Sequence, residues 1–275
     1  MRAVLIAALL LSGCDDDSTN SSAADLSAGG DDLSLAGRDL AGGDMPCAYR
    51  TFTGFIAGQT TPSYFSCACG CLIDSFESAA VSPLWGASMS TNASFVPMTG
   101  VGLGVALTSS SNTLEQGGLA SEGRPTSQFY LDGDFDLRVE YDFGATPPPG
   151  SARLILGVRK PQSLNGTPQY EIEREQRADG ANYYETMLGG VPAQMVATTE
   201  TKGVLRLTRQ GFTLTAYAGA TQVSTLIAQE AGRLVVTLAA TLQGCTVSDL
   251  GTSCGYTPRW HKLELSSGTL VNLPQ

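Results

Sequence analysis

Alternation of apolar and polar residues over short stretches is the feature that most limits what this chain can fold into. In residues 135–143, large apolar side chains alternate with Asp, Arg, Glu and Asp, a pattern typical of a strand with one buried and one solvated face. Residues 204–217 contain two such stretches around Gln210 and Gly211, which predicts a β-hairpin. Further alternating stretches cover residues 101–107, 154–158, 234–238 and 261–265.

These stretches predict about ten short strands separated by turns, which is typical of an antiparallel sandwich or barrel. The one helix candidate, residues 227–232, is too short to form a layer of the fold. With 275 residues, of which 42% are hydrophobic, the chain is long enough to bury one sizeable core. The expected fold class is therefore all-β.

The N-terminus has the pattern of an export signal. Met1 and Arg2 precede an apolar run over residues 3–11, and three Asp residues follow Cys14. The run is shorter than the roughly 20 residues that a membrane-spanning helix needs. Its ending, Leu-Ser-Gly-Cys, resembles the lipobox of bacterial lipoproteins, which implies that residues 1–13 are cleaved and that Cys14 carries lipid, palmitate included. An ordinary secretory signal is the alternative.

Residues 14–46 predict a flexible tether rich in Asp, Ser, Ala and Gly. Asp-Leu recurs there every seven residues, but the interleaved glycines disfavour a coiled coil. The net charge of −10 argues against nucleic acid as a partner. After the tether, the prediction is a Cys-rich lead-in over residues 47–72 and a sandwich over residues 73–275.

The remaining cysteines favour disulfides. Six follow Cys14, namely Cys47, Cys67, Cys69, Cys71, Cys245 and Cys254, and an even number in an exported chain is typical of disulfide bonding. Cysteines two apart on a strand are poorly placed to pair with each other. Cys245 and Cys254 can close a local loop or reach the cluster at residues 67–71. A zinc site on the closely spaced cysteines is the alternative, although its spacing is not typical of zinc.

Several stretches resemble a known family, the concanavalin A-like lectins and glucanases, and in particular bacterial laminin-G-like modules. The resemblance rests on Ile73-Asp74-Ser75-Phe76 with Trp85, on residues 129–136, 205–211 and 213–217, and on residues 260–265. It covers residues 74–270. It implies a two-sheet jelly-roll sandwich with the first and last strands side by side, and a concave face that binds or cleaves glycans in many relatives.

Three glutamates are the catalytic candidates. Glu171, Glu173 and Glu175 lie two residues apart, so on a strand they project from one face. Retaining glycosidases use two carboxyl groups about 5 to 5.5 Å apart. The row resembles the Glu-x-Asp-x-Glu strand of some glucanases of this family. That resemblance implies Glu171 as nucleophile, Glu173 as helper and Glu175 as acid/base.

The same strand also departs from the glucanase pattern. Glu173 replaces an Asp, and Arg174 replaces an apolar residue. Non-enzymatic relatives commonly carry Tyr-x-Ile-x-Arg here, which implies that Tyr170, Ile172 and Arg174 are structural. The alternative to catalysis is a solvated acidic face paired with Arg206 or Arg177.

Glycan binding without catalysis is the main interpretation. Sugars stack on aromatic rings, and alternation places Tyr183 and Tyr184 on opposite faces, so only one can line a groove. Trp85 and Trp260 are expected in the core. The predicted binding residues are Tyr184, Tyr217, Arg174 and Arg206.

No cofactor is expected, with calcium as the alternative. Asp132, Asp134 and Asp136 alternate along the chain, but an EF-hand loop needs Gly at its sixth position and Glu at its twelfth. Leu137 and Phe143 stand there, which favours a turn at Asp132 and Gly133. The single histidine, His261, lies in a predicted strand, where packing is the ordinary role.

The sequence therefore predicts a bacterial lipoprotein attached to the inner or outer membrane through Cys14. Its sandwich domain is expected to present a glycan- or protein-binding surface at the cell envelope. A glycoside hydrolase using the three glutamates is the enzymatic alternative, and a purely structural envelope protein is the third.

Overall fold

The structure is a computed structural model. It describes residues 47–56, 58–86, 89–109, 114–121, 129–144, 150–161, 170–189, 191–227, 232–244 and 254–272. The predicted signal, Cys14 and the tether lie outside these ranges, as does most of the predicted helix at residues 227–232. The described residues form strands and connecting turns. Among them we find no helix with the length and apolar character needed to span a bilayer.

Two sheets account for the strands. The larger, sheet A, has 11 strands: β1 (Arg50–Thr51), β2 (Ser63–Ser66), β3 (Cys71–Asp74), β5 (Ala93–Met98), β6 (Gly102–Ser109), β8 (Tyr130–Asp142), β13 (Lys202–Gln210), β14 (Thr213–Ala218), β15 (Thr221–Ile227), β17 (Cys254–Tyr256) and β18 (Arg259–Asn272). The smaller, sheet B, has seven: β4 (Met89–Thr91), β7 (Glu115–Ala120), β9 (Ser151–Arg159), β10 (Tyr170–Gln176), β11 (Asn182–Leu188), β12 (Val191–Ala197) and β16 (Val235–Gln243).

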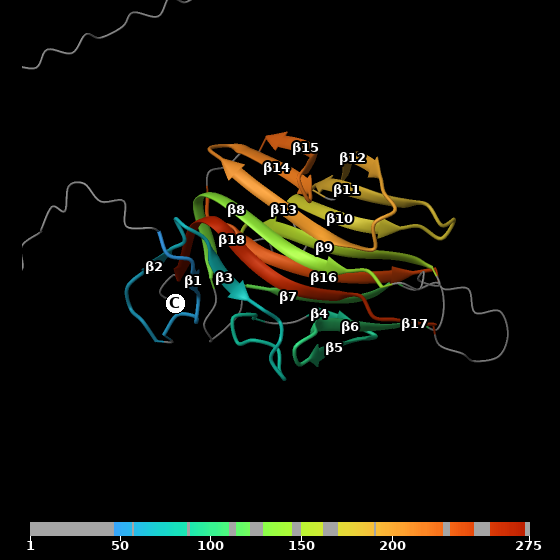
Figure 1. Ribbon diagram of the computed structural model, residues 1–275, viewed down its shortest axis with the longest axis horizontal. Helices are drawn as coiled ribbons and strands as arrows, with labels where there is room; N and C mark the ends of the chain where they lie inside the picture. The colour runs from blue at the N-terminus through green and yellow to red at the C-terminus, as the bar shows by residue number, and fades with distance from the viewer. Residues whose placement is uncertain are drawn as a thin grey trace, which may run out of the picture. The chain divides into compact units, whose positions relative to one another are not determined.

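The pairing confirms the predicted antiparallel jelly-roll sandwich. The main path of sheet A runs β1-β3-β18-β8-β13-β14-β15, and sheet B runs β12-β11-β10-β9-β16-β7-β4. All pairs are antiparallel except β1 with β3. β8 and β18 run side by side across the middle of the domain (Figure 1). β3 pairs with β18, so an early strand lies beside the last one, as the resemblance implied.

One hydrophobic core fills the space between the inward faces of the sheets. Leu137 of β8 and the β9 residues Leu154 and Leu156 belong to it and have no exposed surface. Trp85 and Trp260 are 4% and 0% exposed, which confirms that both tryptophans pack in the core. Burial of such large side chains is the main favourable term that holds the two sheets together.

Residues 47–72 differ from the lead-in that the sequence predicted. They contribute β1, β2 and the first residues of β3 to sheet A, and Phe52 lies in the core at 3% exposure. β2 pairs with the C-terminal part of β18. The sheet therefore begins before residue 73, because the last strand is long enough to pair with both β2 and β3.

The expected turn at Asp132 and Gly133 is also different. Both residues lie inside β8, which runs continuously from Tyr130 to Asp142. Gly133 has a positive φ of 65°, so the strand continues through an irregular backbone position where the sequence predicted a turn. Pairing with β18 on one side and β13 on the other keeps the two halves of the strand in one sheet.

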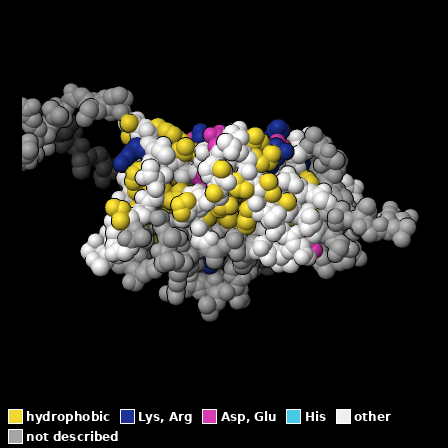
Figure 2. Space-filling model, turned by 90° about the horizontal axis from the view of Figure 1, so that it is seen from below, with side chains coloured by type: hydrophobic (Ala, Val, Ile, Leu, Met, Phe, Trp, Pro, Cys, Tyr) yellow, Lys and Arg dark blue, Asp and Glu magenta, His cyan; other side chains and the backbone are white. Residues whose placement is uncertain are grey.

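Figure 2 views the domain from the side of β4, β5 and β6. Apolar side chains gather across the middle of this face, and most of the visible charged side chains lie along one margin. Val96 of β5 and Val101, just before β6, are both exposed. This face therefore contributes apolar rather than charged surface.

Candidate functional site

β10 divides its side chains between the core and the outer face of sheet B. Tyr170 and Ile172 belong to the hydrophobic core. Side chains alternate along a strand, so Glu171, Glu173 and Glu175 project from the opposite face, as the sequence predicted. We call this the outer face of sheet B.

The strand register brings further side chains beside the glutamates. Glu173 lies opposite Glu185 of β11, and Glu175 lies opposite Arg153 of β9. Glu171 lies opposite Gly157 of β9. Four carboxyl groups therefore share one region of the outer face, and one arginine enters it from the neighbouring strand.

Two arginines contact these carboxyl groups. The guanidinium of Arg153 lies 3.0 Å from Glu175 Oε1 and 3.5 Å from Glu173 Oε2. Arg177, just after β10, donates to Glu175 Oε2 at 2.9 Å and lies 3.6 Å from Glu185 Oε2. The arginines are more than one third exposed, whereas Glu173, Glu175 and Glu185 are at most 2% exposed. The predicted solvated acidic face is therefore wrong, since the carboxyl groups are buried on it.

Burial and the arginines push the pKa values of these acids apart. Burial raises the pKa of Glu171 to about 7, against the opposing charge of Arg153. Burial and the neighbouring carboxylates raise the pKa of Glu173 to about 8. Burial also raises the pKa of Glu185, which shares a hydrogen bond with Glu175. For Glu175, burial is outweighed by Arg177 and Arg153, and its pKa is lowered.

Part of this cluster lacks hydrogen-bond partners. Both carboxyl oxygens of Glu173 and the hydroxyl oxygen of Thr237 are buried without one. Thr237 is on β16 and lies opposite Gly157, which in turn lies opposite Glu171. Its neighbour Leu238 points into the core, so Thr237 shares the outer face with the glutamates. Buried polar atoms without a partner are rare and costly in folded proteins.

The pKa order does not fit the catalytic roles that the resemblance implied. A nucleophile must be ionised and an acid/base must hold a proton. Glu171, the implied nucleophile, has the raised pKa, and Glu175, the implied acid/base, has the lowered one. Glu175 is also held by two arginines. The directions of these pKa shifts are thus the reverse of the division that the resemblance implied.

Two of the predicted binding residues lie in the interior. Arg174 and Tyr184 are 1% and 4% exposed. Arg174 donates to the Glu200 carbonyl oxygen at 2.8 Å and packs over the ring of Phe143. Tyr184 hydrogen-bonds Tyr141 and the Glu200 carboxylate, both at 2.6 Å. Both side chains point toward the core, because the alternation that places the glutamates on the outer face turns Arg174 and its register partner Tyr184 inward.

The other two lie on the outer face of sheet A and contact each other. Arg206 donates twice to Asp136, at 2.7 Å each, and its guanidinium lies 4.7 Å from the ring centre of Tyr217. Arg206 therefore does not pair with the acidic row, whereas Arg177 does. The four predicted binding residues do not form one site.

The three predicted calcium ligands have separate partners. Asp132 pairs with Arg233, Asp136 with Arg206, and Asp134 accepts from the Gly211 backbone N–H. Within the described ranges, no group of three or more His, Cys, Asp or Glu residues is arranged to hold a metal ion.

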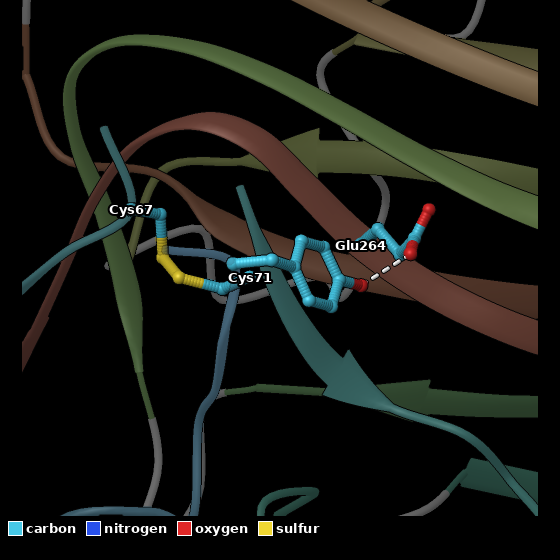
Figure 3. Close-up of a disulfide and its surroundings, with 4 residues drawn as sticks. Cys67, Cys71 and Glu264 are labelled. Carbon is cyan, nitrogen blue, oxygen red and sulfur yellow. Dashed lines mark hydrogen bonds between the residues drawn. A yellow bond between two sulfur atoms is a disulfide. The ribbon is translucent and has the colours of Figure 1, made fainter. Parts of the chain in front are cut away.

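Four of the six predicted disulfide cysteines form two bonds. Cys47 pairs with Cys69 and Cys67 with Cys71, with Cα atoms 5.4 and 5.3 Å apart. Cys245 lies outside the described residues. Figure 3 shows the second bond beside the hydrogen bond from the Tyr49 hydroxyl to Glu264 of β18. The bonds therefore fix the N-terminal segment near the last strand.

The sequence did not identify three members of the cluster. Arg153 and Thr237 are on strands that alternation predicted, and that alternation already implied that they point away from the core. Glu185 is on β11, which was not predicted. The sequence does not show which strands pair with one another. β9 pairs with β16 and with β10, and β10 pairs with β11. This order brings the three side chains beside the glutamates.

Comparisons with known proteins find similar solved structures at low sequence identity. No protein-family model and no curated protein matches the sequence. Among solved structures, a Bacillus licheniformis β-glucanase is similar at 14% identity, covering 74% of this chain and 97% of that one, with a TM-score of 0.44. The catalytic domain of a Thermotoga petrophila laminarinase (12%, 70% and 96%, 0.48) and the carbohydrate recognition domain of Emp47p (13%, 73% and 95%, 0.48) are similar as well.

Proposed function

We propose that this protein is an exported, lipid-anchored β-sandwich that binds a glycan on the outer face of sheet B without cleaving it. One observation carries the proposal: the oxygens of Glu173 and Thr237 are buried with no hydrogen-bond partner. Among the described side chains, none forms a hydrogen bond with Glu171, which keeps 8% of its surface exposed. A ligand rich in hydroxyl groups can supply the missing donors and acceptors.

The arginines argue against cleavage. A retaining hydrolase needs two carboxyl groups that are free to attack and to protonate the glycosidic bond. Arg153 and Arg177 both contact Glu175, which is 1% exposed. Its carboxylate is therefore committed to a structural ion-pair cluster.

A polysaccharide pull-down with product analysis tests this function. The full chain, purified in mild detergent, is incubated with a panel of insoluble and soluble polysaccharides, and released sugars are measured by mass spectrometry. We expect retention on at least one polysaccharide without released oligosaccharides. The E171Q variant should lose retention, while E140Q, which alters an exposed glutamate on the outer face of sheet A, should keep it. Failure to bind any member of the panel would favour the structural envelope protein.

Hydrolysis with exchanged roles is the second candidate, and the split of the pKa values favours it. Glu175 is held ionised and Glu171 has a pKa of about 7, which is the division between nucleophile and acid that glycosidases use. Sugar release that disappears in both E171Q and E175Q, with binding retained, would establish this candidate in place of the first.

A further inference from the structure

The carboxyl groups on the outer face of sheet B outnumber the cations that contact them. Four glutamates meet there, at positions 171, 173, 175 and 185, and within the described residues their ion pairs come from Arg153 and Arg177. Arg159 lies further along the same face of β9, and the positive charge that acts on Glu171 and Glu173 comes from Arg153. The tyrosine on this face, Tyr183, packs under Arg177. Among the described residues, two arginines thus form ion pairs with four acids, so the carboxyl groups exceed their paired cations when all four are ionised.

The deficit is concentrated at one end of the cluster. Both arginines contact Glu175, and Arg177 also lies beside Glu185. Glu173 has only the long contact with Arg153, at 3.5 Å, and no hydrogen bond. Glu171 is opposite Gly157, which has no side chain, and Thr237 follows on the next strand. The groups without partners therefore lie on β10 and β16, on either side of Gly157 of β9.

An ammonium group matches these acceptors in charge and in number. It presents three N–H donors and one positive charge on a compact centre. Two carboxylates and a hydroxyl are three acceptors, and hydrogen bonds between ionised groups are about twice as strong as neutral ones. The acids have no metal-site arrangement in the described part of the chain, which favours an organic cation over a metal ion.

We propose that the glycan recognised at this site carries a free amino group, whose ammonium binds to Glu171, Glu173 and Thr237. This inference rests on the proposed glycan-binding function and specifies its ligand class as an amino sugar without an N-acetyl group. An N-acetyl group removes the charge and two of the three donors, and it adds bulk at the same position.

Binding of the ammonium should also release protons from the carboxyl groups that contact it. In the free protein at pH 6, Glu171 and Glu173 both hold a proton, because burial raises their pKa values to about 7 and about 8. Contact with a cation favours the ionised carboxylates, so up to two protons leave to solvent as the ligand binds. Above pH 8 the carboxylate of Glu171 is already ionised and no proton is released from it.

Titration calorimetry on the full chain in mild detergent tests the inference. Glucosamine oligomers and N-acetylglucosamine oligomers of equal length are titrated at pH 6 in two buffers with different ionisation enthalpies. We expect the glucosamine oligomer to bind at least about tenfold more tightly, as for the loss of one charge-assisted hydrogen bond. The difference between the buffers should report the release of one to two protons per ligand, from Glu171 and Glu173.

Matched variants assign the effect to the site. E171Q should weaken binding of the glucosamine oligomer about 10- to 100-fold and lower the number of protons released per ligand by about one. E140Q, on sheet A, should change neither. Because glutamine has the size of glutamate and no charge to bury, unchanged melting of E171Q shows that the fold is intact.

Three outcomes would overturn the inference in distinguishable ways. Equal affinity for both oligomers, with E171Q still defective, would reject the amino group and leave glycan binding standing. Binding of neither oligomer, nor of any polysaccharide in the panel, would reject both. Tight, E171Q-sensitive binding of spermidine together with no stronger binding of the sugar oligomer would show that the site recognises an amine without a glycan.

Discussion

Glu173 combines properties that folded proteins rarely combine. Its carboxyl group has no exposed surface and no hydrogen-bond partner. Burial and the carboxylates of Glu171, Glu185 and Glu175 raise its pKa to about 8, although the charge of Arg153 opposes them. At neutral pH the group is therefore mostly protonated, and ionising it in the folded state is costly.

This carboxyl group predicts a fall in stability with rising pH. In the unfolded chain Glu173 has its ordinary pKa of 4.5, whereas the folded value is about 8. Between these values the folded state holds more protons than the unfolded state, so the free energy of unfolding decreases as pH rises. Each unit of difference corresponds to about 1.4 kcal/mol at most. Melting temperatures measured from about pH 5 to pH 9 should fall, and E173Q should flatten that slope.

The variant E140Q is the control for this measurement, because that glutamate is exposed on the other sheet. The melting temperature of E140Q should fall with rising pH as steeply as that of the unmodified protein. If the melting temperature of E173Q falls with pH as steeply as that of the unmodified protein, Glu173 is not the group whose proton loss causes the fall.

The motif that first suggested a family has a structural role at the residue level. Asp74 accepts hydrogen bonds from the Phe76 backbone N–H and from Trp85 Nε1, both at 2.8 Å. Phe76 has a positive φ of 55°, which is unusual for an aromatic residue, and stacks on Trp85. Sequence reasoning found these residues but not their role, because their spacing does not reveal that they fold back on one another.

At the scale of elements, alternation predicted the strands that bury one complete face. The β13 and β14 hairpin and the second half of β8 follow the predicted pattern. β7, with the sequence Glu-Gln-Gly-Gly-Leu-Ala, has too few apolar side chains to be predicted. It is a strand because β16 and β4 pair with it on either side. Pairing of this kind is non-local, so a single sequence does not display it.

β6 and β18 approach each other at a glycine. Gly102 has a φ of 124°, and a Cβ atom there would lie 2.5 Å from the Trp260 carbonyl oxygen. We expect G102A to lower the free energy of unfolding by at least about 2 kcal/mol, because both the backbone conformation and the contact oppose a side chain. Denaturant unfolding followed by tryptophan fluorescence measures this loss.

A second glycine provides the comparison for that experiment. Gly133 also has a positive φ, of 65°, but nothing lies within 4 Å of a Cβ atom placed there. G133A should cost only about 1 to 2 kcal/mol, from the left-handed backbone alone. Equal losses in the two variants would show that the close approach of β6 to β18 has no energetic weight.

At the scale of the whole molecule, the outer faces of the two sheets differ in whether their buried carboxyl groups have hydrogen-bond and ion-pair partners. On sheet A, Glu264 receives contacts from Tyr49, Arg138 and Lys262, and these outweigh its burial and lower its pKa. On sheet B, Glu173 remains without a hydrogen bond. The sequence predicted the sandwich and the glutamate row, but it could not predict which face satisfies its own charges, because that depends on register between strands.

The predicted lipid anchor is a property of the whole molecule as well. The lipobox-like ending at residues 11–14 predicts that C14S prevents lipid attachment. Stable anchoring needs at least two acyl chains, so the variant should move from the membrane pellet to the soluble fraction. Fractionation of cells labelled with a palmitate analogue measures both effects. Membrane retention of unlabelled C14S would indicate a different means of attachment.

The two disulfides determine how this domain bears a mechanical load. A pull on the N-terminal side enters the described structure at Cys47, which is bonded to Cys69, and the neighbouring bond joins Cys67 to Cys71. Cys71 pairs with Leu265 of β18, next to the centre of sheet A. Tension is therefore carried through covalent bonds to the interior of the sheet, and it does not peel β1 away from the edge one hydrogen bond at a time.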